Sequence, residues 1–378
     1  MKITLISNSL NCGGAERQIV YLAGLLKQQG HNICFVCINK GTFYEKILES
    51  YGLKANYQYA EQFSFALKKK HRIIRELYKL ITKIKLIVFI ATLKSDVTIS
   101  YLELSNRINC ISSLIHNCKV ITGERNAIRP VTKSLAWRYY KFLMGRSDYI
   151  VCNSEVANKM WQEIVPSYAI KLKTIYNIVY KPIILQDIKY EVRKNGKLKI
   201  VVPASYDNTR KNYTGLVSAL QLIPNKYKKS FHIDWYGNIN TTIENSKVYN
   251  ETMAIVRNNN LGEMISFHNK VSNIGEIMET ADIVAIFSHV EGLPNGICEA
   301  MSLGKPIIMT KVSDYRMLVG SNGFLCESRD PRSICNCIIR AVNLSNQDIL
   351  NMGKCSKEMF NSLFSVDASL IKWNSLIN

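Results

Sequence analysis

The chain has 378 residues, and 47 % of them are hydrophobic and spread along its whole length. This content excludes an intrinsically disordered chain, and the length is sufficient for two domains with separate cores. The formal net charge of +20 indicates an anionic partner, such as a membrane surface or a nucleic acid. The sequence has no zinc-finger spacing and no basic segment studded with aromatic residues, so we expect no nucleic-acid partner.

The 11 cysteines show no paired framework that would indicate disulfides. Cys34 and Cys37 have C-x-x-C spacing but lie within the apolar segment ICFVCI, without the turn and further ligands of a zinc site. We therefore predict buried core thiols and a cytoplasmic location. We find no signal-peptide core at the start and no run of ~18 apolar residues, so we predict no transmembrane helix.

The first half of the chain alternates between strand-like and helical patterns. A parallel, doubly wound sheet is predicted when strand, helix and strand follow in this order. An amphipathic helix at 15–30 follows a loop that ends in Gly13 and Gly14. Strands are predicted at residues 2–7, 32–38, 96–102, 119–124, 148–154 and 172–179.

Residues 68–94 form a basic segment with an apolar body. The segment holds nine Lys or Arg residues and one Glu, and it includes the apolar run LITKIKLIVFIATL. This combination is typical of a surface that lies on anionic lipid. The alternative is a solvated charge run beside a buried helix or strand.

The pattern restarts after residues 181–197, which read as a linker. A helix is predicted at 212–223, and strands at 198–205, 231–237, 264–270, 282–288 and 305–310. We therefore divide the chain into domains at 1–180 and 198–355, with a C-terminal helix at 356–378 that packs back on the first domain. Ligands of open α/β sheets bind at the carboxyl ends of the strands, so we expect both domains to face a central cleft.

The segment EGLPNGICEAMSLGKPII, at 291–308, places Glu291 just after a predicted strand and Glu299 one turn inside a helix. A helix N-terminus attracts phosphate, and Gly296 lets the backbone of Asn295, Gly296 and Ile297 approach one closely. Glu299 is placed to accept hydrogen bonds from two vicinal ribose hydroxyls, and Glu291 from a sugar. The alternative is a surface acid and a first-turn acid that favours the helix dipole.

This segment resembles the E-x7-E signature of the retaining glycosyltransferases of family 4, which have the GT-B fold of two Rossmann-like domains. Other segments resemble the family in the same order, so the resemblance covers nearly the whole chain. They are NCGGAERQIVYLAGLLKQQGH (11–31), DYIVCNSE (148–155), IYNIV (175–179) and SNGFLCESRDP (321–331).

The resemblance implies that the C-terminal domain binds a nucleotide-sugar and the N-terminal domain an acceptor. It assigns the donor ribose to Glu299 and the donor sugar to Glu291. Gly13 and Gly14 would approach the diphosphate and sugar from the other domain. Lys211 would neutralise the departing diphosphate, with Arg210 beside it.

The sequence departs from the family pattern at two places. The Arg that usually precedes the catalytic Lys is absent, because Ala204 and Ser205 stand there, and Arg210 is a candidate replacement. A His is usual after the strand that ends here in Glu124, Arg125 and Asn126, which we assign to the acceptor or phosphate side. None of the six histidines is assigned to catalysis.

No Asp-x-Asp occurs in the sequence, so we expect neither a metal nor another cofactor. Our hypothesis is a metal-independent retaining hexosyltransferase at the inner face of the cell membrane, acting on a lipid-linked saccharide in polysaccharide synthesis. The alternatives are a nucleotide-sugar 2-epimerase with the same fold and a GT-B shell that binds without catalysis. A nicotinamide dehydrogenase is disfavoured because the glycine loop lacks G-x-G-x-x-G spacing.

Overall fold

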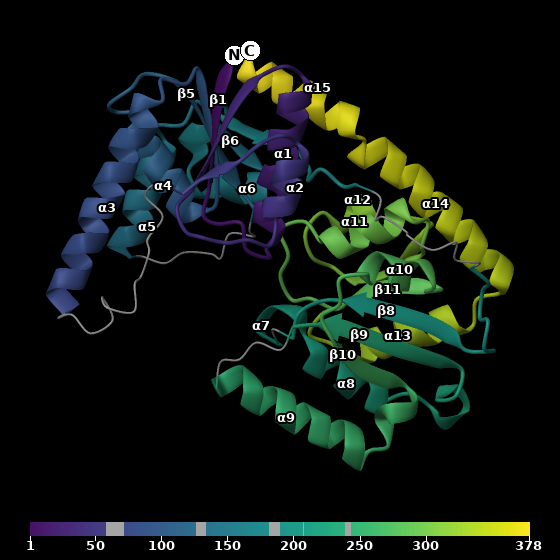
Figure 1. The fold of residues 1–378 in the computed structure, drawn as a ribbon. Helices are drawn as coiled ribbons and strands as arrows, with labels where there is room; N and C mark the ends of the chain where they lie inside the picture. Colours follow the sequence, from purple (N-terminus) through teal and green to yellow (C-terminus); the bar gives the residue numbers. More distant parts are fainter. Residues whose placement is uncertain (58–71, 126–133, 181–189, 207, 239–242) are drawn as a thin grey trace. The chain divides into compact units, whose positions relative to one another are not determined.

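The computed structural model describes residues 1–57, 72–125, 134–180, 190–206, 208–238 and 243–378 (Figure 1). The chain forms two compact units. The N-terminal unit comprises residues 1–178 together with 366–378, and the C-terminal unit comprises residues 179–365.

The N-terminal unit is built on a seven-stranded parallel sheet in the order β3-β2-β1-β4-β5-β6-β7. Strands β1 and β4 are neighbours although β2 and β3 lie between them in sequence, so the strand order reverses at this point. The strands are β1 (Lys2–Ser7), β2 (Asn32–Cys37), β3 (Ala55–Asn56), β4 (Val97–Tyr101), β5 (Lys119–Glu124), β6 (Tyr149–Cys152) and β7 (Leu172–Thr174).

Helices connect these strands and pack on the sheet with their buried apolar residues. Two of the elements, α3 and α4, share a core with β1 and β2, and α5 and α6 share another with β6 and β7. The helices are α1 (Gly14–Gln28), α2 (Glu45–Ser50), α3 (Arg72–Thr92), α4 (Glu103–Ser112), α5 (Leu135–Met144), α6 (Glu155–Ile164) and α15 (Val366–Ile377), with a 3-10 turn at Pro166–Tyr168.

The C-terminal unit has a six-stranded parallel sheet in the order β10-β9-β8-β11-β12-β13. Its strands are β8 (Leu198–Pro203), β9 (Phe231–Gly237), β10 (Ile265–Asn269), β11 (Ile283–Ile286), β12 (Ile307–Thr310) and β13 (Gly323–Cys326). Its helices are α7 (Asn208–Lys211), α8 (Tyr213–Gln221), α9 (Ile243–Asn258), α10 (Ile274–Glu279), α11 (Asn295–Ser302), α12 (Tyr315–Leu318), α13 (Pro331–Val342) and α14 (Asn346–Phe364), with 3-10 turns at Asn225–Tyr227 and Leu261–Glu263.

Helix α11 ends in a glycine stop that returns the chain to β12. Gly304 has a φ of +67°, and the N–H of Lys305 donates to the carbonyl oxygen of Ala300 at 3.0 Å. This is the left-handed cap that satisfies the last carbonyls of a helix. A Cβ at Gly353 of α14 would collide with the Gly304 carbonyl oxygen, so two glycines allow α14 to pack closely on α11.

The structure confirms the predicted parallel α/β architecture of both halves and adds β3 and β13, which the sequence analysis did not identify. The C-terminal helix at 356–378 requires correction, because the chain forms α14 and α15 with Ser365 between them. Only residues 366–378 join the N-terminal unit, since α14 is packed on α11. Most of the predicted linker, residues 181–189, lies outside the described residues.

The C-x-x-C thiols agree with the core interpretation. Cys37 is buried, and burial raises the pKa of its thiol to about 12, while Cys34 is half-buried with a raised pKa of the same origin. None of the 11 cysteines forms a disulfide. Among the described residues, no helix combines the length and the apolar content needed to cross a membrane.

Candidate functional site

Glu291 lies past the carboxyl end of β11 and is almost buried, with 8 % of its side chain exposed. Its Oε1 accepts a hydrogen bond from the Ser288 hydroxyl at 2.6 Å. The same oxygen accepts a hydrogen bond from Nζ of Lys211, whose side chain is 20 % exposed. The structure thus joins the predicted sugar-binding acid and the predicted diphosphate-binding cation in one ion pair.

The next residue, Asn212, holds Lys211 in place. Its backbone is left-handed, with a φ of +59°, and its side-chain oxygen accepts from the Gly215 N–H at 3.1 Å as the N-cap of α8. Its amide nitrogen donates to the carbonyl oxygens of Phe287, at 3.0 Å, and Ser328, at 2.7 Å. The sequence analysis missed this residue, although an Asn just before a helical pattern is a capping signal.

Arg210 lies near the same carboxyl edge of the C-terminal sheet, because its carbonyl oxygen accepts from the His289 N–H at 2.7 Å. Burial, and secondarily the charge of Arg329, lower the pKa of the His289 imidazole. Within the described part of the chain, the ring Nδ1 of His289 is buried without a hydrogen-bond partner. A neutral imidazole therefore lies two residues from Glu291.

Helix α11 begins at Asn295, with Pro294 as its N-cap, so the predicted helix start is correct. A Cβ at Gly296 would lie 2.9 Å from Cγ of Pro203, which explains a glycine at this position. Asn295 and Glu299 are half-buried. The side chain of Ile297 is fully buried. Its N–H, which was predicted to face a phosphate, donates in this structure to the Pro294 carbonyl oxygen at 3.0 Å.

In the N-terminal unit, Gly13 is the N-cap of α1 and Gly14 is its first residue. A Cβ at Gly13 would collide with the Glu16 carboxylate, which lies against the glycine. Burial raises the pKa of Glu16. The glycines therefore open the helix start as predicted, and the structure adds an acid at the place where the sequence analysis put a diphosphate and sugar.

Arg125 follows β5 at the carboxyl edge of the same sheet and is only 8 % exposed. Its guanidinium carbon lies 3.8 Å from the centre of the Tyr101 ring, and Nη1 donates to Oδ1 of Asn177 at 3.3 Å. Asn153 donates to the Arg125 carbonyl oxygen at 3.3 Å. The neighbouring Glu124 is equally buried. Asn126 lies outside the described residues.

Helix α15 packs against the Tyr101 ring on which Arg125 stacks. The Trp373 ring lies 6.4 Å from the Tyr101 ring, and Nζ of Lys119 donates to the Ile377 carbonyl oxygen at 2.9 Å. The stacked guanidinium is therefore held by an aromatic ring that is itself packed in the core. A rigid guanidinium of this kind is suited to a carboxylate or phosphate group.

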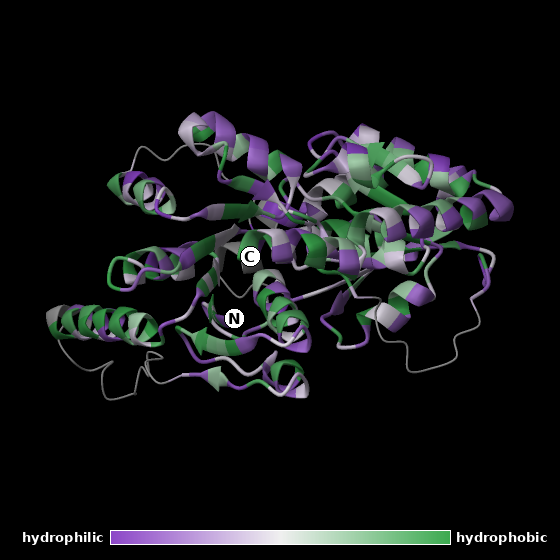
Figure 2. Cartoon of the chain, turned by 90° about the horizontal axis from the view of Figure 1, so that it is seen from above, coloured by the Kyte–Doolittle hydropathy of each residue, from purple (hydrophilic) through white to green (hydrophobic). Residues whose placement is uncertain are grey.

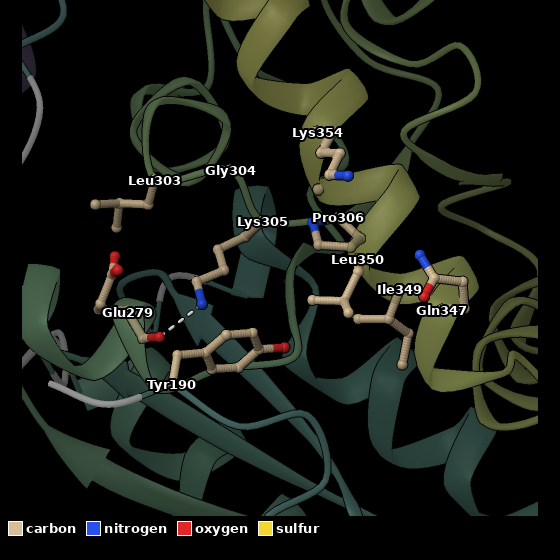
Figure 3. A pocket seen from close by; sticks show the side chains of 11 residues that line it. Tyr190, Glu279, Leu303, Gly304, Lys305, Pro306, Gln347, Ile349, Leu350 and Lys354 are labelled. Atoms are coloured by element: carbon tan, nitrogen blue, oxygen red, sulfur yellow. Dashed lines mark hydrogen bonds between the residues drawn. The ribbon is translucent and has the colours of Figure 1, made fainter.

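A separate pocket of about 490 Å³ lies at the opposite edge of the C-terminal sheet, before β12 (Figure 3). There the Lys305 Nζ donates to the Glu279 carbonyl oxygen at 2.6 Å and lies 3.4 Å from the centre of the Tyr190 ring. The amine thus caps the C-terminus of α10. The described residues contain no cluster of His, Cys, Asp and Glu able to hold a metal ion.

Comparisons with known proteins agree over most of the chain. Residues 12–180 match the model described as "Glycosyltransferase Family 4", and residues 197–343 match "Glycosyl transferases group 1". A Haemophilus influenzae protein described as an uncharacterized glycosyltransferase is 23 % identical over 378 residues, or 98 % of each chain.

Two further proteins extend the comparison. A Campylobacter jejuni enzyme is 23 % identical over 80 % of this chain and 77 % of its own; its name is GalNAc-alpha-(1->4)-GalNAc-alpha-(1->3)-diNAcBac-PP-undecaprenol alpha-1,4-N-acetyl-D-galactosaminyltransferase. The Anabaena HepE structure in complex with UDP has a TM-score of 0.80 at 17 % identity and covers 99 % of each chain. The likeness to HepE concerns the fold.

Proposed function

We propose that this chain, which belongs to glycosyltransferase family 4 and has the GT-B fold, transfers a hexose from a nucleotide-sugar with retention of anomeric configuration. The observation that carries the proposal is the Lys211–Glu291 pair beside the start of α11. This cluster lies where β8 and β11 are neighbours in the sheet and the strand order reverses. Ligands of doubly wound sheets bind at such a point.

The donor would contact several features of this cluster. The open first turn of α11, where Gly296 allows close approach, would receive the diphosphate together with the Lys211 ammonium. Glu299, one turn further along the helix, would accept hydrogen bonds from the ribose hydroxyls. Glu291 would hold hydroxyls of the sugar, and Arg210 would add positive charge near the diphosphate.

The chemistry would use the leaving group as base. The bond between the anomeric carbon and the donor phosphate oxygen breaks, and the acceptor hydroxyl oxygen bonds to the same face of that carbon. The acceptor proton passes to the departing phosphate oxygen. Lys211 would stabilise the developing diphosphate charge, so no metal is required in this scheme.

Two relatives guide the choice of substrates. HepE has been crystallised with UDP and with UDP-glucose, which favours UDP as the first nucleotide to test. The name of the Campylobacter jejuni relative describes an undecaprenol-diphosphate-linked acceptor. We infer a lipid-linked saccharide acceptor for this chain as well, with Glu124 and the stacked guanidinium of Arg125 on the acceptor or phosphate side.

This acceptor would place the protein at the cytoplasmic face of the membrane during polysaccharide synthesis. The basic segment 68–94, of which residues 72–94 are described, would contact anionic lipid through α3. Gly13 and Gly14, at the start of α1, would also take part in donor binding. A shift of the Glu16 carboxylate away from Gly13 would accompany such binding.

The test is a thermal-shift panel with UDP, GDP, ADP, CMP and dTDP, with and without chelator, followed by transfer of labelled sugar to a membrane extract. We expect one nucleotide to stabilise the protein with chelator present and Glu299→Ala to abolish the shift. A saturating ligand at about 100 times its Kd stabilises by about 2.7 kcal/mol. Donor epimerised without acceptor would indicate the 2-epimerase, and no shift with any nucleotide would indicate a non-catalytic shell.

A further inference from the structure

Helix α3 turns an apolar stripe away from the protein. In a surface helix the apolar face normally packs on the core. In the described part of α3, Ala91 is buried, Ile87 and Phe89 are half-buried, and the residues packed most deeply in the core are Leu86 and Ile90. The outward stripe repeats at helical spacing and lies opposite to these two residues. Its members are Ile74, Leu77, Tyr78, Ile81, Ile84 and Val88, with exposed fractions between 43 % and 55 %.

Helix α5 carries a second outward stripe that the sequence analysis did not identify. Leu135, Tyr139 and Phe142 follow the i, i+4, i+7 spacing of one helix face and are 79 %, 48 % and 66 % exposed. On the opposite face, Tyr140 and Met144 are buried against β6 and α6.

The two stripes belong to one side of the N-terminal unit. Helix α4 packs against both α3 and α5, so the three helices form one layer on the same face of the sheet (Figure 1). Figure 2 shows hydrophobic colour along much of α3. Together the stripes are larger than the isolated apolar residues that are normal on protein surfaces.

Basic side chains accompany both stripes. Lys85 is exposed within the α3 stripe and Arg138 beside the α5 stripe, whereas the half-buried Lys79 and Lys83 lie on the opposite face of α3. Apolar faces with Lys and Arg are the pattern of helices that lie in the interface of an anionic bilayer. A second copy of the chain is a poor occupant, because it would bring the same positive charges face to face.

We propose that α3 and α5 together form a docking face for an anionic lipid bilayer, with both apolar stripes in the interface and the sheet above it. This inference rests on the proposed lipid-linked acceptor and deepens it. As crossover helices in a parallel sheet, both helices begin at the carboxyl edge, where Arg125 lies. A diphosphate that projects from the bilayer would thus meet the edge that carries the guanidinium.

The test compares the purified full chain and two double variants in co-sedimentation with phosphatidylcholine vesicles, with or without an equal part of phosphatidylglycerol. Leu135→Gln with Phe142→Gln removes apolar surface from α5, and both side chains are exposed, so we expect the fold to persist. The matched control, Leu222→Gln with Ile371→Gln, changes residues that are 47 % and 70 % exposed on other surfaces. We expect the α5 variant to bind anionic vesicles at least about tenfold more weakly and the control to bind as the wild type does.

Fluorescence gives a direct readout of insertion. In Phe142→Trp the new indole should be quenched by brominated anionic lipid, whereas in Ile371→Trp it should not. Unchanged vesicle binding of the α5 variant, or a Phe142→Trp signal that brominated lipid leaves unaffected, would overturn the proposal. Light scattering without vesicles that shows a dimer lost in the α5 variant would assign the face to a second copy and overturn it too.

The UDP thermal shift separates this inference from the proposed function. The α5 variant should retain the shift of the wild type, because the stripe lies outside the nucleotide site. A retained UDP shift with unaltered vesicle binding would reject the docking face and leave the transferase proposal standing. Vesicle binding that depends on the stripe, in a protein that responds to no nucleotide, would reject the transferase and keep the docking face.

Discussion

Replacing Lys211 by methionine removes the cation that pairs with Glu291 and leaves a carboxylate with 8 % exposure, to which the Ser288 hydroxyl donates. Exposed ion pairs contribute about 0–1 kcal/mol, whereas removing one partner of a buried pair costs about 3–5 kcal/mol. With one partner buried and the other 20 % exposed, we expect Lys211→Met to lower the free energy of unfolding by about 2–3 kcal/mol.

The change at the other partner, Glu291→Gln, should lower the free energy of unfolding by about 1 kcal/mol. The amide oxygen still accepts from Ser288, and water reaches the ammonium group of Lys211. The double variant should then lose less free energy of unfolding than the two single variants lose in sum, by about 1–2 kcal/mol. Urea unfolding without nucleotide measures the three values. In the transfer assay, Lys211→Met should lower kcat/KM by about 10²–10³-fold.

A second lysine–glutamate pair in the same unit serves as the matched control. Lys311 and Glu327 also form an ion pair, but their side chains are 43 % and 55 % exposed. Lys311→Met should leave stability and kcat/KM unchanged within error. Two results would refute the argument that burial makes the first pair strong. One is that the Lys211 and Glu291 variants lower the free energy of unfolding additively, and the other is that Lys311→Met lowers it as much as Lys211→Met does.

Three further predictions concern the C-terminal unit. Gly296→Ala should lower stability by about 1–3 kcal/mol and weaken the UDP thermal shift, because the new Cβ would meet Pro203. The control Gly262→Ala should do neither, because the space around Gly262 is open. Asn212→Ala should cost about 2–4 kcal/mol in urea unfolding, since it removes three hydrogen bonds at a positive φ. Burial lowers the pKa of Lys305 to about 8 from 10.5. Between these two pH values the unfolded chain binds more protons than the folded one, so the free energy of unfolding should rise with pH. Lys305→Met should lack this rise.

The sequence by itself determined the repeating α/β pattern and the local form of the Glu291–Glu299 segment. Alternation of apolar strands with amphipathic helices is a local signal, so both sheets could be predicted from it. Strand β3 is too short for this signal, because it has two residues. Strand β13 has four residues and was missed although strands of the same length, such as β11, were predicted. Pro294 at the start of α11 and Gly304 after its end are equally local signals.

Only the tertiary structure decided which side chains meet. Lys211 and Glu291 are 80 positions apart, and they pair because β8 and β11 are neighbours in the sheet, so the chain segments that follow these two strands emerge side by side. The stacking of Arg125 on Tyr101 has the same origin, since β4 and β5 are adjacent.

Burial is the other quantity that the sequence could not provide. The sequence places Ile297 in a predicted phosphate-binding turn. In the structure its side chain lies in the core and its N–H donates to the Pro294 carbonyl oxygen. The apolar spacing of α5 reads as an ordinary core-facing helix, and the structure shows a second face turned outward. Helical periodicity states which residues share a face, but the packing of neighbouring elements decides which face is covered.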